Sequence, residues 1–241
     1  DTVNEVITKV MEKESIMLQL TGIRDIDNYT FLHSIDVCIY STIIGKNLGY
    51  DMDTLTLLGM GAVLHDIGKC KIPAHLLRKP GSLSEDEYNE IKEHSVLGYE
   101  IIRNSYGLNE KIASISLQHH ERWDGSGYPS GLMSYNIDPF ARIIALADVY
   151  DALISDRIYK KRYLPDIAAK YISKNSGTLF DPKLVEVFVN SIVASTEGTL
   201  VLLSTGELGS VIPPKVSDGS RQLIYVFSNK FGPPVFEPYI I

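Results

Sequence analysis

The sequence predicts a mainly α-helical protein that ends in a small β-rich appendage. Apolar residues recur at helical spacing from Asp1 to about Ala194. After Glu197, short segments rich in β-branched and aromatic residues alternate with glycine, serine and proline, which is typical of strands and turns. All six histidines lie between residues 33 and 120, so we expect the chemistry of the chain in its helical part.

Breakers and capping residues divide the helical part into separate helices. The Pro80-Gly81 pair interrupts the helical pattern. Ser84 followed by Glu87 matches a capping box, which marks a helix start, and Asp181-Pro182 supplies an N-cap and a first-turn proline for the last helix. The predicted helices cover residues 2–20, 28–48, 53–66, 84–104, 109–120, 138–154, 165–173 and 182–194. The predicted strands cover residues 199–203, 209–212 and 222–227.

Length and composition indicate one main domain with short additions at both ends. The chain has 241 residues, of which 44% are hydrophobic and 22% charged, as in ordinary globular proteins. We expect an N-terminal helix in residues 1–24, a main domain in residues 25–195 and a β-rich extension in residues 196–241. The first residue is Asp1 rather than methionine, so we expect the N-terminal helix to act as a linker from an upstream domain.

The charge and the cysteine content argue against several classes of protein. A formal net charge of -7 disfavours broad affinity for DNA, which requires an extended basic surface. No apolar run approaches the roughly 18 residues of a membrane span, and the N-terminus lacks the pattern of a signal peptide. Cys38 and Cys70 form no CxxC pair, so no disulfide scaffold is expected. We therefore expect a cytoplasmic protein without a membrane or DNA partner.

Histidines and aspartates together predict a metal centre. His65 and Asp66 are adjacent, as are His119 and His120, and Asp148 lies on the apolar stripe of a predicted helix. A single histidine on an apolar face is most often a hydrogen-bonded core residue. Several inward imidazoles with buried carboxylates are hard to explain without a cation, because an uncompensated buried charge is costly. This mixture of ligands suits Fe, Mn or Zn rather than Ca or Mg.

Four segments resemble a known family. His65–Lys69 (HDIGK) resembles the HD signature of HD-superfamily phosphohydrolases, and His119–Pro129 (HHERWDGSGYP) is similar to the HHE…DGxGYP stretch of the HD-GYP branch. Asp27–Ser34 and Ala147–Leu153 flank these segments in the order found in the family. The similarity covers about residues 25–190, and it implies an HD-type helical bundle.

The resemblance also implies two metal ions that share one carboxylate, Fe or Mn with Zn as an alternative. It assigns one ion to His33, His65, Asp66 and Asp148, and the other to Asp66, His94, His119 and His120. It places Lys69, Arg157 and Lys160 near the substrate phosphates, and Tyr128 and Pro129 in a loop beside the site. By the same resemblance, Asp66 is expected to bridge the ions, and Lys69 is expected either to stabilise a phosphate oxygen or to protonate the leaving group.

A third metal ion is not expected. Some family members place a glutamate ligand four residues before the first histidine, and Tyr29 occupies that position here. A phenol with a pKa near 10 is a poor ligand at neutral pH. Asp27 and Asp151 are the nearby substitutes, and Asp151 keeps a third ion open because it follows Asp148 by one helical turn. His75 fits no ligand position and is expected at the surface.

The resemblance implies a metal-dependent phosphodiesterase that opens a cyclic dinucleotide. Cyclic di-GMP is the expected substrate, with linear pGpG or GMP as the product, in bacterial second-messenger signalling. Two alternatives stay open: a catalytically weak HD-GYP module that binds a signalling partner such as a GGDEF protein, and an HD phosphohydrolase that acts on other nucleotides. The complete ligand set favours the enzyme over the module, and the GYP segment argues against other nucleotides. The oligomeric state is left open.

Overall fold

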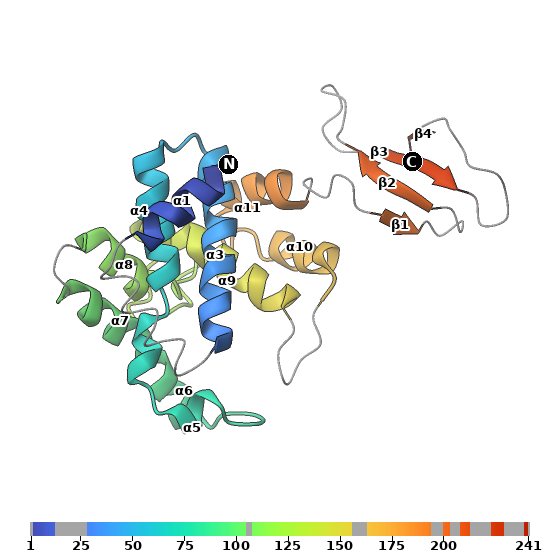
Figure 1. The fold of residues 1–241 in the computed structure, drawn as a ribbon. Helices are drawn as coiled ribbons and strands as arrows, with labels where there is room; N and C mark the ends of the chain where they lie inside the picture. Colours follow the sequence, from blue (N-terminus) through green and yellow to red (C-terminus); the bar gives the residue numbers. More distant parts are fainter. Residues whose placement is uncertain are drawn as a thin grey trace. The chain divides into compact units, whose positions relative to one another are not determined.

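The computed structural model describes residues 2–12, 28–104, 108–155, 163–193, 200–202, 208–212, 223–228 and 239–240. The chain divides into two compact units, residues 1–188 and residues 189–241 (Figure 1). Each unit is described by itself below. None of the described helices has the length and apolar character that crossing a membrane requires.

The first unit is helical, as predicted. Its longest helices are α3 (Asn28–Asn47), α4 (Met52–Leu64) and α9 (Pro139–Ile154). The other helices are α1 (Thr2–Met11), α5 (Ala74–Leu77), α6 (Glu85–Lys92), α7 (His94–Arg103), α8 (Glu110–Gln118), α10 (Pro165–Lys174) and α11 (Pro182–Phe188). Two short 3-10 turns, η1 (Ile67–Lys71) and η2 (Ser134–Asn136), connect them.

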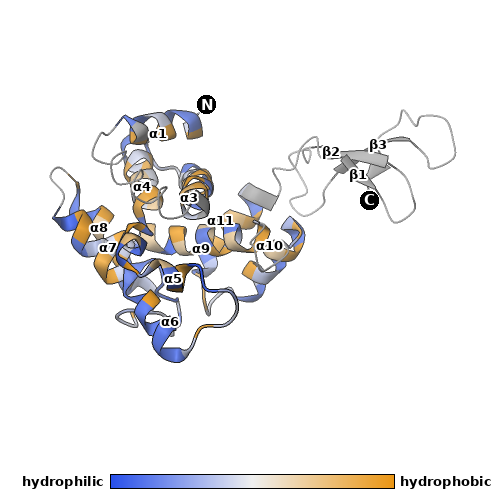
Figure 2. Cartoon of the chain, turned by 60° about the horizontal axis from the view of Figure 1, so that its bottom comes forward, coloured by the Kyte–Doolittle hydropathy of each residue, from blue (hydrophilic) through white to orange (hydrophobic). Residues whose placement is uncertain are grey.

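Helices α3, α4 and α9 form the centre of this unit. α3 packs along α4 and against α9, and α8 contacts both α4 and α9. Ile44, Leu58 and Ile144, one from each central helix, are completely buried. Figure 2 shows apolar residues concentrated on the central helices, whereas α6 is mostly hydrophilic. Burial of these apolar faces supplies the main driving force for folding.

Two glycines bring η1 close to α7. A β-carbon on Gly68 would lie 1.9 Å from the carbonyl oxygen of His94, and one on Gly98 would lie 3.2 Å from the Gly68 nitrogen and 2.2 Å from Ser116 Oγ on α8. No side chain larger than hydrogen fits at such distances, so both positions require glycine. The close approach brings the end of α4, where His65 and Asp66 lie, next to the first turn of α7.

The predicted helix over residues 84–104 is two helices. α6 begins with the predicted capping box, in which Ser84 accepts the N–H of Glu87 and the Glu87 carboxylate accepts the N–H of Ser84. The break falls at Glu93, whose N–H donates to the carbonyl of Glu90 three residues earlier at 3.2 Å. This tighter turn ends α6 and allows α7 to start in a new direction at His94.

Two further helices differ from their predicted bounds. α1 ends at Met11, and residues 13–20 of the predicted first helix lie outside the described residues. The predicted last helix continues beyond α11 as a π-helical turn, η3 (Val189–Val193).

The second unit contains a four-stranded antiparallel sheet in the order β1-β2-β3-β4. The strands are β1 (Leu200–Leu202), β2 (Leu208–Ile212), β3 (Leu223–Ser228) and β4 (Tyr239–Ile240). The first three coincide with predicted strands to within one or two residues, and β4 was not predicted. An irregularity between Leu208 and Gly209 shifts the register of β2 on β3.

Candidate metal centre

Five helix ends or helix faces of the first unit carry the predicted ligands. The structure brings all of them together, and they come from α3 (His33), the end of α4 (His65 and Asp66), the start of α7 (His94), the end of α8 (His119 and His120) and α9 (Asp148). Apart from His120 and Asp148, which are partly buried, these side chains are buried. The exposed His75 lies on α5 and takes no part in the cluster.

Asp66 lies between two groups of imidazoles. Its Oδ2 atom is 3.3 Å from His65 Nε2. Its Oδ1 atom is 3.3 Å from His94 Nε2 and 3.7 Å from His119 Nε2. The ligand atoms of His33, His65 and Asp66 lie within 4.8 Å of one another, and so do those of Asp66, His94, His119 and His120. One carboxylate therefore presents an oxygen to each group.

Asp148 and Asp151 each contact one of the two ring nitrogens of His33. His33 Nε2 is 3.1 Å from Asp148 Oδ1, on the side of the cluster. His33 Nδ1 is 2.6 Å from Asp151 Oδ2, and Asp151 also accepts a hydrogen bond from Ser155 Oγ at 3.0 Å. Asp151, considered from the sequence as a third-ion ligand, thus contacts the ring nitrogen opposite the cluster. Asp27, the other substitute, lies outside the described residues, as does the side chain of Tyr29.

Three other imidazoles are oriented by carbonyls at the ends of helices. The Nδ1 atoms of His65, His94 and His119 each lie 2.7 Å from the carbonyl oxygen three residues earlier, in Ala62, Ile91 and Ser116. Carbonyls in the last turn of a helix have no partner within the helix. Each ring therefore donates its Nδ1–H to such a carbonyl and turns its Nε2 lone pair towards Asp66.

The arrangement of unpaired atoms fits bound metal ions. His65 Nε2 and Asp66 Oδ1 are buried without a hydrogen-bond partner among the described residues. His94 Nε2 lies 3.3 Å from His119 Nε2 and 3.1 Å from His120 Nε2. Because His94 and His119 already donate from Nδ1, their neutral rings direct lone pairs at each other, which is unfavourable without a cation between them. The donor set of imidazole nitrogens and carboxylates suits divalent transition metals.

The directions of the pKa shifts in the cluster agree with this conclusion. Burial opposes ionisation of Asp66, but Lys69 and the neighbouring imidazoles hold the pKa of that carboxyl well below its usual range. Burial lowers the pKa of His94 to about 3 and also lowers the pKa of His119 and His120. His33 differs, because its hydrogen bonds to Asp148 and Asp151 outweigh the effect of burial and raise its pKa to about 9.

Lys69 lies at the edge of the cluster. It belongs to η1, one turn after Asp66, and its Nζ is 2.5 Å from Asp66 Oδ2. Its side chain is 27% exposed while that of Asp66 is 2% exposed. Lys69 therefore connects the buried carboxylate to the surface.

Comparison with known proteins identifies the family. The family model described as "HD domain" matches residues 27–184. The chain belongs to the HD domain family. The match contains every residue of the cluster, and it confirms the resemblance stated from the HD and GYP segments.

Relatives of this HD domain include cyclic dinucleotide phosphodiesterases. The chain is 34% identical over 212 residues to a cyclic di-GMP phosphodiesterase of Pseudomonas aeruginosa, with 88% of this chain and 51% of that protein aligned. It is 39% identical over 189 residues to a cyclic di-GMP phosphodiesterase response regulator of Xanthomonas campestris (78% and 50% aligned). It is 35% identical over 161 residues to a 3′3′-cGAMP-specific phosphodiesterase of Vibrio cholerae (66% and 31% aligned). The chain spans about half the length of the first two relatives.

The fold is also similar to that of a solved structure. An HDG"Y"P protein from Bdellovibrio bacteriovorus superposes with a TM-score of 0.56 at 25% identity, covering 66% of this chain and 51% of that one. The likeness confirms the predicted HD-type helical fold.

The GYP segment of the HD domain lies beside the cluster. Tyr128 stacks on the ring of His120, with centroids 4.7 Å apart and planes 29° apart. Lys92 Nζ lies 5.7 Å from the centroid of the Tyr128 ring, so a cation flanks it as well. Pro129 follows in the same loop and is exposed. Arg157 and Lys160, the other predicted phosphate contacts, lie outside the described residues.

Two buried acids near the site have roles that the sequence did not reveal. Asp151 orients His33, and its position one turn after Asp148 on the same helix face was the available signal. Glu121 directly follows His120 and is 2% exposed. Its position within the GYP segment was noted, but its contacts depend on how the following loop folds back.

Proposed function

We propose that this HD domain is a metal-dependent phosphodiesterase that hydrolyses a cyclic dinucleotide. Cyclic di-GMP is the proposed substrate. The observation that carries the proposal is the shared carboxylate: Asp66 directs one oxygen to His65 and the other to His94 and His119. Such sharing is the arrangement of two-ion sites that act on phosphate esters. The named activities of the relatives support the choice of substrate.

Two divalent ions fit the cluster, and we propose Fe or Mn. His33, His65, Asp66 and Asp148 would hold the first ion, and Asp66, His94, His119 and His120 the second. Bound there, the ions would supply positive charge that activates water and neutralises charge developing on the phosphate. Asp151 is engaged with His33 Nδ1 and Ser155, which supports two ions rather than three.

The remaining residues would bind and orient the substrate. Lys69 has its ammonium at the mouth of the cluster, where it can donate to a phosphate oxygen or pass a proton to the leaving oxygen. Tyr128 presents a ring beside His120, which suits contact with the dinucleotide. Arg157 and Lys160 are proposed as further phosphate contacts, since each charge-assisted hydrogen bond to phosphate contributes about 1.5–3 kcal/mol.

The test is turnover by the metal-loaded protein. The protein is incubated without oxygen with Fe(II) or Mn(II) and with cyclic di-GMP, 3′3′-cGAMP, cyclic di-AMP or linear nucleotides, and products are separated by chromatography. We expect metal-dependent opening of cyclic di-GMP to pGpG or GMP, and elemental analysis showing two ions per chain. Hydrolysis of linear nucleotides alone would refute the substrate class, and binding of cyclic di-GMP without hydrolysis would identify an interaction module instead.

A further inference from the structure

We propose that Glu121 is a positioning residue that holds the loop of residues 125–132 (the GYP loop) against the His119-His120 turn. The proposal rests on the proposed function, because that function places Tyr128 of this loop beside the substrate. Glu121 itself contacts neither a candidate ligand atom of the cluster nor a substrate-binding side chain in the contacts of the described residues. It would therefore act through the loop.

The Glu121 carboxylate accepts hydrogen bonds from both ends of the second half of the loop. Its Oε1 accepts the N–H of Ser130 at 2.8 Å, and its Oε2 accepts the N–H of Leu132 at 3.0 Å. The residue is 2% exposed. Burying a carboxylate is costly unless donors satisfy it, and hydrogen bonds to a charged acceptor are stronger than neutral ones. The side chain and the loop thus stabilise each other.

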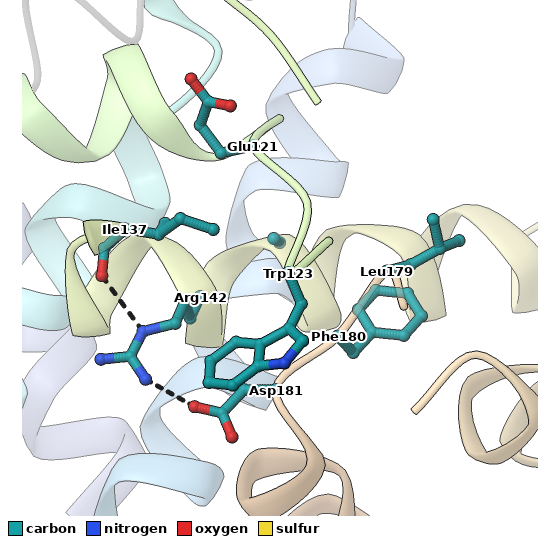
Figure 3. Close-up of a pocket in the computed structure, with 8 residues that line it drawn as sticks. Glu121, Trp123, Ile137, Arg142, Leu179, Phe180 and Asp181 are labelled. Carbon is teal, nitrogen blue, oxygen red and sulfur yellow. Dashed lines mark hydrogen bonds and ion pairs between the residues drawn. The ribbon is translucent and has the colours of Figure 1, made fainter. Parts of the chain in front are cut away.

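The residues that follow Glu121 are held by the segment that precedes α11. The N–H groups of Trp123 and Asp124 donate to the carbonyls of Leu179 and Thr178 at 3.2 and 2.8 Å. The cavity between Glu121, Trp123, Arg142 and Asp181 is only about 10 Å³, about the size that one water molecule needs. Figure 3 shows the Glu121 carboxylate directed away from the Arg142–Asp181 ion pair. Its charge is therefore directed to the loop rather than to this cation.

The first half of the loop packs directly on the ligand turn. A β-carbon on Gly127 would lie 2.4 to 2.5 Å from backbone atoms of His120, Glu121 and Arg122. The N–H of Tyr128 donates to the carbonyl of His120 at 3.3 Å, and the two rings stack. Gly125 and Gly131 have positive φ angles of 82° and 64°, which allow the loop to reverse at both ends. Glu121 closes this loop by accepting hydrogen bonds from its second half, at Ser130 and Leu132.

The consequence is that the ring of Tyr128 is held in one place by contacts on both sides. On one side the loop touches the backbone of His120, and on the other side it is held by the Glu121 carboxylate. Without the carboxylate, the returning half of the loop loses two acceptors, and Tyr128 no longer has a fixed position over His120. Turnover should then fall although the metal ligands are intact.

The first measurement tests whether Glu121 holds the GYP loop, and it does not depend on activity. In Glu121→Gln the carboxylate becomes an amide, so one of the two acceptors is replaced by an NH₂ group that faces an N–H donor. Hydrogen exchange of the peptide covering residues 125–132 should speed up about tenfold or more, as expected when a buried donor loses its acceptor. Asp138→Asn is the matched control, because Asp138 also accepts a backbone N–H, that of Phe140 at 2.8 Å, outside the loop. Unchanged exchange in Glu121→Gln would overturn the proposal.

The second measurement tests the link to Tyr128. With metal content equal to that of the wild type, Glu121→Gln should lower kcat/KM for the cyclic dinucleotide about 10- to 100-fold, because a small misplacement of a substrate-positioning group is costly, whereas Asp138→Asn should not. In a Tyr128→Ala background, Glu121→Gln should change kcat/KM less than about twofold, because residues that act together are not additive. Additive effects, or loss of metal in Glu121→Gln, would overturn the proposal.

A second variant covers the case that Glu121→Gln does not fold. Gly127→Ala leaves the carboxylate in place but pushes the loop off the turn, so it should produce the same faster exchange and the same loss of turnover. Wild-type kinetics in Gly127→Ala would overturn the proposal. If the wild-type protein opens no cyclic dinucleotide, the proposed function fails, whereas the exchange result still decides whether Glu121 holds the loop.

Discussion

At the scale of single residues, the cluster depends on the protonation of its members in the metal-free protein. His94, His119 and His120 have lowered pKa values because burial disfavours their charged forms, so their rings are neutral at neutral pH. Asp66 is charged there because its pKa is well below its usual range. Metal ions bind neutral imidazoles and ionised carboxylates. The group around His94 is therefore ready for an ion, whereas the group around His33 still carries a proton.

Replacement of Asp66 should affect both ions at once. We expect Asp66→Ala to abolish turnover and to lower the metal content at both positions, because its two oxygens face different imidazole groups. The measurements are elemental analysis and product chromatography. His75→Ala is the control, since His75 is an exposed histidine outside the cluster. Substantial turnover by Asp66→Ala would contradict the assignment.

Metal binding at His33 should release a proton. In the metal-free protein the pKa of His33 is about 9, so an ion must displace the proton on Nε2 below that pH. The apparent affinity at this position should rise about tenfold per pH unit up to pH 9 and level off above it, because one proton is released per ion. The position around His94, with a pKa of about 3, should show no such dependence near neutral pH.

Calorimetry of Mn(II) binding at neutral pH measures this proton directly when it is repeated in buffers of different ionisation enthalpy. His33→Gln is the control, because it removes the titrating ring and should remove the pH-dependent component. Equal pH dependence at both metal positions would show the prediction to be wrong.

At the scale of secondary-structure elements, an ion pair between a partly buried arginine and a buried aspartate connects α9 to the start of α11. Arg142 on α9 pairs with Asp181, with side chains 14% and 3% exposed. Asp181 also accepts the N–H of Lys183 at 2.9 Å in the first turn of α11. Arg142 lies over the rings of Trp123 and Tyr135 as well. The pair thus connects two helices to the segment that follows the His119-His120 turn.

Breaking this pair should be destabilising. We expect Asp181→Ala to lower the free energy of unfolding of the first unit by about 3 kcal/mol, the lower end for a buried pair, because it leaves a partly buried guanidinium without its carboxylate partner. Urea denaturation followed by fluorescence of Trp123, the single tryptophan of the chain, measures this unit. Asp166→Ala is the control: its pair with Lys170 is exposed and should contribute nothing measurable. A loss as small as that of the control would contradict the prediction.

The elements that the sequence predicted well are those with local signals. Ser84 and Glu87 form the expected capping box, and the apolar stripe of α8 is buried up to His119. The break at Glu93 could not be predicted, because no glycine or proline marks it and the apolar spacing continues on both sides. It depends on a tertiary feature, the turn that places His94 against Asp66.

The candidate site likewise has features that the sequence predicted and features that it did not. Inward-facing histidines followed from helical spacing, and their assignment to two groups followed from the family resemblance. The partners of the rings did not follow from either. Whether Asp151 faces an ion or His33 Nδ1 depends on the packing of α3 on α9. The contacts of Glu121 likewise depend on a loop that returns nine residues later.

At the scale of the whole molecule, the candidate chemistry lies in one of the two units. Every described residue of the cluster, together with Lys69, Glu121 and Tyr128, lies within residues 1–188. The strands of the second unit begin at Leu200.

Removal of the second unit should leave the chemistry intact. We expect a protein of residues 1–195 to keep its metal content and its turnover, because all proposed ligands and phosphate contacts precede Tyr163. Elemental analysis and product chromatography on the shortened protein and on the protein of 241 residues provide the comparison. A folded, metal-loaded protein of residues 1–195 without turnover would show that the second unit contributes to catalysis.

The helix-end carbonyls that orient His65, His94 and His119 belong to the polypeptide itself, so the direction of each ring does not depend on an ion. Each Nδ1 lies 2.7 Å from a carbonyl three residues earlier. We therefore expect a chelator to remove the ions while the helices stay folded, whereas small zinc domains unfold without their ion. Circular dichroism before and after chelation, followed by reloading with Mn(II), measures this, and loss of the helical signal on chelation would contradict it.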